Sequence, residues 1–318
     1  MASAVEILAI VRLARQCASD GVPAVLARLV SVEGSHYRKP GARMLLARDG
    51  RSAGAISAGC LEADLRERLP GVLSSGRAEI VEYDSRTFED LVWGLGSGCN
   101  GRVRILLSPL TASLREALER AGATLSGGAA VRLSTVVLAP AGSDRPAGEV
   151  RLLAAGESIP EEDGAEVIVE EIPPPISLLI AGCGSDAVPV ARMAAELGWT
   201  VSVLADHDLS FVLERFAGLP VAHAGGNASA SAVPVHPRSA AVVMSHSFAD
   251  DAAALAALLP RGFPYLGVLG PRERTRRLLA SCGGSEAAEI HSPAGLNLGA
   301  ETAEEIALSI VAEIQATL

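Results

Sequence analysis

The 318-residue sequence is poor in aromatic residues and cysteine, and it has no run of lysine or arginine. Acidic residues outnumber basic ones, 37 against 27, which gives a formal net charge of −10. Such a chain lacks the basic face that holds a phosphate backbone or an anionic bilayer, so neither nucleic acid nor a membrane is an expected partner. The five cysteines are an odd number in a long chain, which argues against a disulfide framework and for a reducing, cytoplasmic location.

Long hydrophobic runs are also missing. The longest apolar stretches, such as 176–181 and 240–244, are a third or less of the roughly 20 residues that a membrane-spanning helix needs. Residues 1–13 contain Glu6 within an apolar pattern and have no basic leader or cleavage site. We therefore expect neither a transmembrane helix nor a signal peptide.

Aliphatic side chains are abundant: 49 % of the residues are hydrophobic and 20 % are charged. This composition suits densely packed helix and sheet layers, and the length suits two domains. Residues 173–175 are three consecutive prolines, which form an extended, stiff linker. We predict an N-terminal mixed α/β domain over 1–172, with a less regular middle region at about 112–172, and a C-terminal domain over 173–318.

Short β-rich segments separated by turns dominate the N-terminal half. Lys39-Pro40-Gly41 and Arg48-Asp49-Gly50 are typical turn sequences. An amphipathic helix precedes the first strand, and a second helix is predicted from about Gly59-Cys60. The expected strands are 24–32, 42–47, 52–56, 78–83 and 103–107, followed in the middle region by helix 114–121 and hairpin segments around 131–138 and 150–153.

Strands and helices alternate clearly in the C-terminal half. The expected strands are 176–181, 200–204, 240–244 and 265–269, and the expected helices are 187–197, 250–259 and 272–280. This alternation predicts a Rossmann-like, doubly wound parallel sheet. Thr302 and Glu305 predict a capping box at the start of a last helix.

A glycine-rich turn follows the first strand of that half and opens a helix. Gly182 allows a tight turn, Gly184 allows a pyrophosphate to approach the backbone, and Ala187 allows close packing between helix and strand. Asp206, about 20 residues further on, is the candidate ribose contact. Asp186 adds a negative charge to the turn, so a Rossmann-like domain without a dinucleotide, or with another ligand, is an equally good interpretation.

Two of the cysteines lie in glycine-rich loops, at Ser57-Ala58-Gly59-Cys60 and Ser97-Gly98-Cys99. A thiol just before a helix N-terminus is favoured as thiolate, which makes Cys60 a candidate nucleophile or soft-metal ligand. We expect Cys60 and Cys99 to contact a ligand, although a free cysteine is also commonly a small packed residue. Cys17 and Cys282 lie on predicted helices and are expected to pack.

Four further residues are candidates for anion or ligand contacts. Arg38 and Arg43 concentrate positive charge in an acidic chain and suit a phosphorylated or anionic ligand. His246 follows a predicted strand at the edge where ligands bind in open α/β sheets, so it is a candidate ligand contact or acid/base. Arg272 follows the next strand and is a candidate anion contact; each of these residues could also be structural.

Together these motifs resemble the xanthine dehydrogenase accessory (XdhC/CoxI) family. The segments that carry the resemblance occur in order from about residue 30 to the C-terminus: 33–43, 56–64, 94–101, 182–199, 242–246, 265–272 and 292–302. The chain departs from the family pattern at Cys183 and Ser185 in the glycine-rich turn, at Ala205 after the second strand, and at Asn297.

The resemblance implies a chaperone that binds the molybdenum cofactor (molybdopterin) and delivers it to a molybdenum hydroxylase such as xanthine or carbon monoxide dehydrogenase. It also implies sulfuration of the metal with a cysteine desulfurase as partner. The family's cysteine corresponds to Cys60, which would hold the cofactor or its metal, and a soft thiolate suits a sulfur-rich metal centre.

Two hypotheses remain open from the sequence. The first is a cofactor-insertion chaperone, non-catalytic or weakly catalytic, that uses Cys60 and Cys99. The second is an NAD(P)-dependent oxidoreductase that binds the nucleotide with Gly182, Gly184, Ala187 and Asp206 and uses His246 or Cys60 as proton donor. The alanine-rich helices are compatible with a homodimer.

Overall fold

The computed structural model describes residues 3–84, 101–159, 164–205, 208–283 and 289–318. The chain divides into two compact units, Met1–Pro174 and Pro175–Leu318. Each unit has its own sheet or sheets, its own helices and its own buried core.

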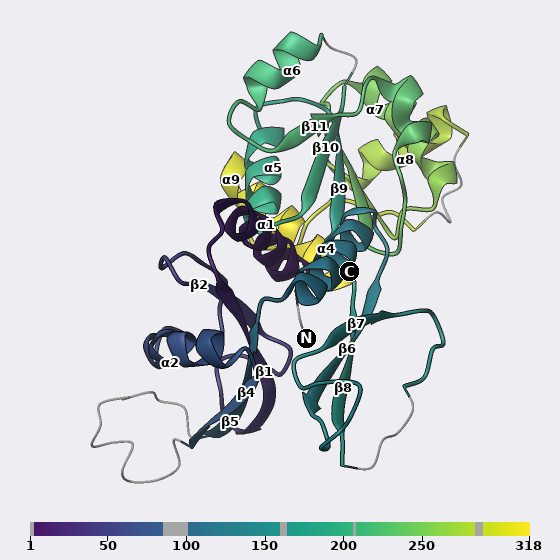
Figure 1. Ribbon diagram of the computed structural model, residues 1–318. Coiled ribbons are helices and arrows are strands. Elements are labelled where there is room, and N and C mark those ends of the chain that lie inside the picture. Colours follow the sequence, from purple (N-terminus) through teal and green to yellow (C-terminus); the bar gives the residue numbers. More distant parts are fainter. Residues whose placement is uncertain (1–2, 85–100, 160–163, 206–207, 284–288) are drawn as a thin grey trace. The chain divides into compact units, whose positions relative to one another are not determined.

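A five-stranded antiparallel sheet forms the centre of the N-terminal unit, in the order β3-β2-β1-β5-β4 (Figure 1). Its strands are β1 (Ala24–Gly34), β2 (Arg43–Ala47), β3 (Ser52–Gly54), β4 (Glu79–Asp84) and β5 (Gly101–Pro109). The helices described in this unit are α1 (Ala4–Asp20), α2 (Glu62–Ser75) and α4 (Ala112–Ser126).

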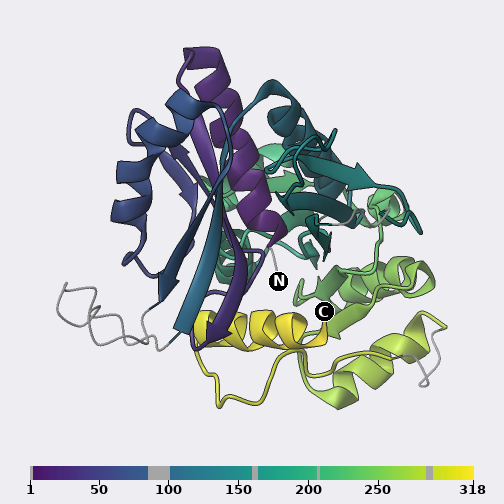
Figure 2. The same ribbon diagram turned by 60° about the horizontal axis from the view of Figure 1, so that its bottom comes forward.

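Side chains alternate along β1, so both faces of this sheet are covered. Val25, Ala27 and Leu29 pack in one cluster with α2, whereas Ala24 and Leu26 pack in another with α1 and α4. Figure 2 shows α1 and α2 on opposite sides of the sheet. A strand that is buried on both faces is almost continuously apolar, which is why its sequence predicts a strand without polar alternation.

The middle region, predicted to be less regular, contains α4 and a three-stranded antiparallel sheet in the order β7-β6-β8. The strands β6 (Val131–Leu138) and β7 (Val150–Leu153) match the predicted hairpin segments. The strand β8 (Glu166–Ile172) is absent from the prediction because its three glutamates obscure the apolar pattern.

A buried ion-pair cluster joins the two sheets of this unit. Arg28 on β1 lies opposite Arg43 on β2, and their side chains are only 3 % and 2 % exposed. Both guanidinium groups pair with the carboxylate of Glu170 on β8. Burial, together with the neighbouring charge of Arg43, lowers the pKa of Arg28 to about 9. Two buried guanidinium groups therefore share one carboxylate as their counter-charge.

The C-terminal unit contains a parallel sheet in the order β11-β10-β9-β12-β13, which confirms the predicted Rossmann-like, doubly wound fold. Its strands are β9 (Ser177–Ala181), β10 (Thr200–Leu204), β11 (Val221–His223), β12 (Ser239–Val243) and β13 (Tyr265–Val268). The helices described are α5 (Ala187–Glu196), α6 (Leu209–Arg215), α7 (Phe248–Leu258), α8 (Arg272–Ser281) and α9 (Ala303–Thr317), with short 3₁₀ helices η1 (Asn227–Ala232) and η2 (Leu259–Arg261).

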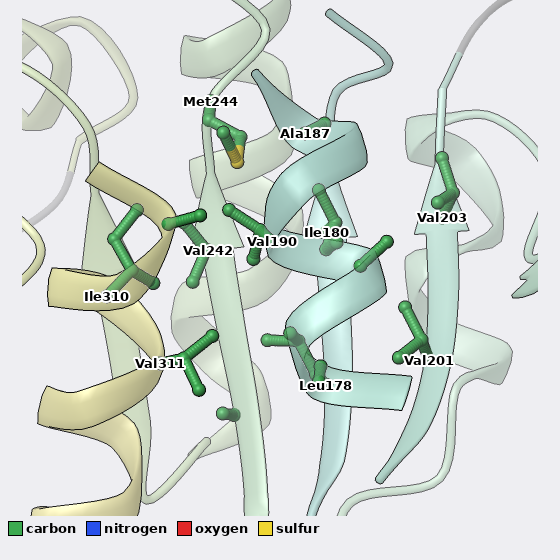
Figure 3. Packing of buried hydrophobic residues seen from close by; sticks show 14 of the residues in the cluster. Leu178, Ile180, Ala187, Val190, Val201, Val203, Val242, Met244, Ile310 and Val311 are labelled. Atoms are coloured by element: carbon green, nitrogen blue, oxygen red, sulfur yellow. The ribbon is translucent and has the colours of Figure 1, made fainter. Parts of the chain in front are cut away.

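Both faces of this parallel sheet are apolar. Leu178 and Ile180 of β9 pack with α5 and α9, whereas Leu179 and Ala181 pack with α7 and α8 on the opposite face. Figure 3 shows the first of these layers, in which Val190 of α5 lies over Ile180 and its neighbours. Helices on both faces are what a doubly wound sheet requires.

One predicted feature of this unit is confirmed at its last helix, and several short elements were not predicted. Thr302 and Glu305 form the predicted capping box at the start of α9. The elements absent from the prediction are α6, with 7 residues, β11, with 3 residues, and the 3₁₀ helices η1 and η2, all too short to show a period. No helix within the described ranges combines the length and the apolar surface needed to span a bilayer.

Replacing Glu170 with alanine leaves Arg28 and Arg43 buried without a counter-charge. We expect the free energy of unfolding to fall by about 3–5 kcal/mol, as is typical when one partner of a buried ion pair is removed. Denaturant unfolding followed by circular dichroism measures this loss. The control is Glu171→Ala, an exposed neighbour for which we expect a change within about 0.5 kcal/mol; equal losses in the two variants would contradict the assignment.

Candidate functional site

The turn that carries Cys60 lies between β3 and α2. Cys60 is a free, partly buried cysteine that packs beside the core under α2. Gly59, which precedes it, has a φ of +112°, a backbone conformation that residues with a Cβ rarely adopt. A Cβ at Gly59 would meet nothing within 4 Å, so the backbone turn, and not lack of space, requires glycine there.

The carboxylate of Glu62 holds this turn in place. It accepts hydrogen bonds from the Ser57 amide at 2.8 Å, from the Leu61 amide at 3.2 Å and from the Ser57 hydroxyl. The same hydroxyl accepts from the amides of Gly59 at 3.1 Å and Leu61 at 3.2 Å. Burial raises the pKa of Glu62, but the hydrogen bonds outweigh it and leave this pKa below its usual value. Cys60 therefore lies on a turn that is fixed on both sides.

This turn changes where α2 begins. The helix begins at Glu62, two residues after the predicted start, because Ser57 and Glu62 draw residues 57–61 into the turn. Cys99, the other cysteine predicted to contact a ligand, lies outside the described residues. Within the described part of the chain, no group of three or more His, Cys, Asp or Glu is placed to hold a metal ion. A metal at Cys60 would have to bring most of its ligands with it.

The two arginines that follow β1 pair with carboxylates inside the N-terminal unit. Arg38 pairs with Glu6 of α1 at 2.7 Å. Arg43 pairs with Glu170 and donates to the carbonyl of Gly41 at 2.8 Å. Both arginines are thus already paired with carboxylates of their own unit, and their contact with a phosphorylated or anionic ligand stays a prediction.

In the C-terminal unit, the glycine-rich turn joins β9 to α5. Gly182 has a φ of +134°, and a Cβ there would lie 2.8 Å from the backbone of Met244 and Ser245. Ala187 is fully buried in the core between the sheet and α5. Both positions need small residues, because the end of β12 and the first turn of α5 leave no room for larger ones.

Asp186 and His246 form a pair at the edge of the sheet where the strand order reverses. His246 follows β12, which is the neighbour of β9, and its Nε2 lies 2.7 Å from an Asp186 carboxylate oxygen. The φ of His246 is 65°, an unusual and strained value for a residue with a side chain. The other Asp186 oxygen would lie 2.5 Å from a Cβ at Gly184. This carboxylate thus occupies the space over the turn that a pyrophosphate would approach.

The segment that carries His246 is held by Asp251, which is only 1 % exposed. Asp251 accepts hydrogen bonds from the amide of Ser245 at 2.9 Å and from its hydroxyl at 2.5 Å. It also pairs with Arg274 at 2.7 Å. The left-handed backbone at His246 is therefore maintained by a buried carboxylate that has its own counter-charge.

A cavity of about 200 Å³ lies after β12 and β13, and its lining includes His246, Asp251 and Arg274. Arg272, the predicted anion contact in this region, does not line the cavity. Its guanidinium instead donates to the carbonyl of Ser292 at 3.1 Å. The arginine that lines this cavity is therefore Arg274, two residues after Arg272 on α8.

Another cavity, of about 300 Å³, is lined by the glycine-rich turn, the end of β10 and α6. Arg215 of α6 lies over the ring of Phe211, 5.3 Å from its centroid, and both residues line the cavity. Asp206, the predicted ribose contact, lies outside the described residues. Cys183 is buried, and burial raises the pKa of its thiol, so it is a packed residue and not a nucleophile.

Sequence reasoning missed the carboxylates that hold these loops. These carboxylates are Glu62 and Asp251, and the sequence pattern also did not indicate Arg274, which pairs with Asp251. The sequence does contain a pattern that could have indicated the two carboxylates, which is an acidic residue early in a helix a few residues after a loop serine. Glu62 follows Ser57 by 5 residues, and Asp251 follows Ser245 by 6. In both cases the acid accepts from the serine amide and hydroxyl.

Two family models match the sequence. The model described as the XdhC and CoxI family matches residues 17–84, which include the Cys60 turn. The model described as the XdhC Rossmann domain matches residues 178–314, which include the glycine-rich turn and His246.

Relatives cover nearly the whole chain. It is 33 % identical over 315 residues to a probable xanthine dehydrogenase subunit from Bacillus subtilis (strain 168), covering 93 % of each protein. It is 28 % identical to the molybdenum cofactor insertion chaperone PaoD of Escherichia coli (strain K12), covering 96 % of this chain and 86 % of that protein. A crystal structure of a xanthine dehydrogenase from Bacillus halodurans matches with a TM-score of 0.80 at 31 % identity, over 96 % of this chain and 95 % of that chain. These matches confirm the resemblance seen in the motifs, and the chain belongs to the XdhC and CoxI family.

Proposed function

We propose that this protein binds the molybdenum cofactor as cargo, holds its metal through the thiolate of Cys60, and assists its sulfuration and insertion into a molybdenum hydroxylase. The observation that carries the proposal is the Cys60 turn, which Glu62 fixes through three hydrogen bonds. The similarity to the relative named as a molybdenum cofactor insertion chaperone supports the molybdenum cofactor as the cargo. The relative named for xanthine dehydrogenase supports a client of that class.

The chemistry of the turn suits this cargo. Molybdenum in its cofactor is a soft, sulfur-rich centre, and a thiolate is the protein ligand that such a metal prefers. The described residues contain no cluster of three or more metal-binding side chains. A single cysteine is nevertheless sufficient to hold the molybdenum, because the cofactor supplies the other ligands of the metal. Because the turn is held by Ser57 and Glu62, the thiol can bind without the chain having to order itself first.

The partners follow from the same proposal. The client is a xanthine dehydrogenase or a carbon monoxide dehydrogenase type of molybdenum hydroxylase, and the sulfur for the metal comes from a cysteine desulfurase. Both encounters would occur in the cytoplasm, and a homodimer is compatible with them. In this account the protein itself is a delivery factor and not an oxidoreductase.

One observation favours the alternative, an NAD(P)-dependent oxidoreductase. His246 has a strained backbone and lies at the carboxyl edge of the parallel sheet, where such folds bind ligands. Against it, Asp186 lies over Gly184, where a pyrophosphate would bind, and the cavity beside the turn is only about 300 Å³, at the lower limit for a small-molecule site. We therefore favour the chaperone.

Replacing Cys60 with serine removes the soft ligand and keeps the shape of the turn. We expect the molybdenum content of protein purified from a molybdenum-replete host to fall to background, measured by elemental analysis together with pterin fluorescence. The control is Cys282→Ala, a partly exposed cysteine of the C-terminal unit, which should leave the content unchanged. Retention of molybdenum by Cys60→Ser, or high-affinity NADH binding by a protein that never carries metal, would overturn the proposal.

Replacing Glu62 with alanine frees the turn but keeps the thiol. We expect cargo affinity to fall about tenfold, the lower end of the effect seen when a group that orients a metal ligand is lost. Glu67→Ala, an exposed residue on the same helix, is the matched control. Equal affinity for the cargo in wild type, Glu62→Ala and Glu67→Ala would contradict the assigned role of Glu62 in holding the turn.

The lowered pKa of Glu62 also predicts a pH dependence. A carboxyl group whose pKa falls on folding stabilises the protein above its usual pKa, here 4.5, and loses this contribution as pH falls through the lower folded-state value. The difference in unfolding free energy between wild type and Glu62→Ala should therefore be constant near neutral pH and shrink in acid below about pH 4.5. Denaturant titrations across this range measure it, and a difference that grows on acidification would be inconsistent with the assigned hydrogen bonds.

A further inference from the structure

The N-terminal unit contains a cavity of about 830 Å³ that none of the family motifs touches. It is lined by the segment between α2 and β4, the end of β5, the first turns of α4, the segment that joins β6 to β7, and β7 itself. Figure 1 shows α4 beside β7 in this region. Its volume lies within the roughly 300–1,000 Å³ of small-molecule sites.

This cavity is separate from the Cys60 turn. Leu107 of β5 packs in the cluster under α2, where Cys60 also packs. Ser108 is the next residue on the strand, so its side chain points to the opposite face, and it lines the cavity. A ligand bound here would therefore not be the ligand held by Cys60.

Two cationic side chains border the cavity and are available to a ligand. Arg77 and Arg120 are exposed, and in the described part of the chain neither guanidinium has an ion pair or a hydrogen bond. Arg151 also borders the cavity but already pairs with Glu149. Glu116 is a further acidic group on the lining. The uncompensated charge at the cavity mouth is thus positive, in a chain that is acidic overall.

The floor of the cavity offers hydrogen-bond donors. Ser108 is buried, at 5 % exposure, and within the described residues its hydroxyl has no partner. The N-terminus of α4, a helix of 15 residues with no acidic residue in its first turn, borders the same space through Thr111 and Ser113. The Leu114 amide already donates to the Thr111 hydroxyl at 3.2 Å, so the amides left for an anion in this first turn are those of Ala112 and Ser113. The Ser108 hydroxyl, which has no partner among the described residues, is a further donor to the same space.

The shape of the floor depends on a glycine. Gly148 has a φ of +87°, and a Cβ there would lie 2.7 Å from the Ser108 hydroxyl oxygen. Any side chain at this position would fill the space in front of the hydroxyl. The walls above it are apolar and include Leu114, Val150 and Leu152.

We propose that this cavity binds an organic phosphate monoester with a heterocyclic body. Arg77 and Arg120 would pair with the phosphate oxygens, Ser108 and the first amides of α4 would donate to them, and the apolar walls would cover the ring. A nucleoside monophosphate and a phosphorylated non-nucleotide ring share this chemistry. The inference does not depend on the proposed cargo of Cys60.

Isothermal titration of the full-length protein with AMP and with riboflavin 5′-phosphate tests the proposal, with adenosine and inorganic phosphate as partial ligands. We expect at least one of the two phosphate esters to bind, its dephosphorylated or ring-free counterpart to bind at least about tenfold more weakly, and added salt to weaken binding. Arg77→Ala and Arg120→Ala should each weaken binding about tenfold, and Ser108→Ala by a smaller factor. Arg12→Ala, an exposed arginine on α1, should change nothing.

Three results would overturn the inference. The first is that neither ester binds to wild type. The second is that an ester binds equally well to the Arg77→Ala/Arg120→Ala double variant, with circular dichroism verifying that this variant is folded. The third is that Gly184→Val, and not the arginine substitutions, abolishes binding, which would place the ligand in the C-terminal unit.

Discussion

The carboxylate of Glu170 is the constraint on which the N-terminal unit depends. Arg28 and Arg43 lie opposite each other on neighbouring strands, both almost fully buried, and Glu170 from the second sheet is the counter-charge they share. This pairing ties the two sheets together, and it removes Arg43 from the surface that the sequence suggests for anions. Arg38 is paired in a similar way with Glu6, at 2.7 Å.

A loop is held by the same kind of hydrogen bonding in each of the two units. A carboxylate early in a helix accepts from the amide and hydroxyl of a serine in the preceding loop: Glu62 holds Ser57, and Asp251 holds Ser245. The residue that lies in the loop between the serine and the carboxylate differs between the two units. In the N-terminal unit it is the thiol of Cys60, which suits a soft metal, and in the C-terminal unit it is His246, whose ring is already paired with Asp186. This difference is why we assign the cargo to the first loop.

Much of the fold could be predicted because its apolar patterns are strong: β6, β7 and β10 agree residue by residue with the predicted strands. Prediction failed where glutamates obscure the pattern, in β8, and where elements are short, in β11. The loops of the candidate site were located because glycines at strand ends mark them locally. The carboxylate partners of Arg38 and Arg43 could not be predicted, since they lie 32 and 127 residues away in the chain.

The central claim is that the Cys60 thiolate binds the metal of the cargo directly. X-ray absorption at the molybdenum K-edge, measured on the loaded full-length protein, tests it without reference to delivery or activity. The account predicts one more sulfur neighbour of molybdenum in the wild-type complex than in the same cofactor free in solution. Identical sulfur shells in the two samples would contradict it.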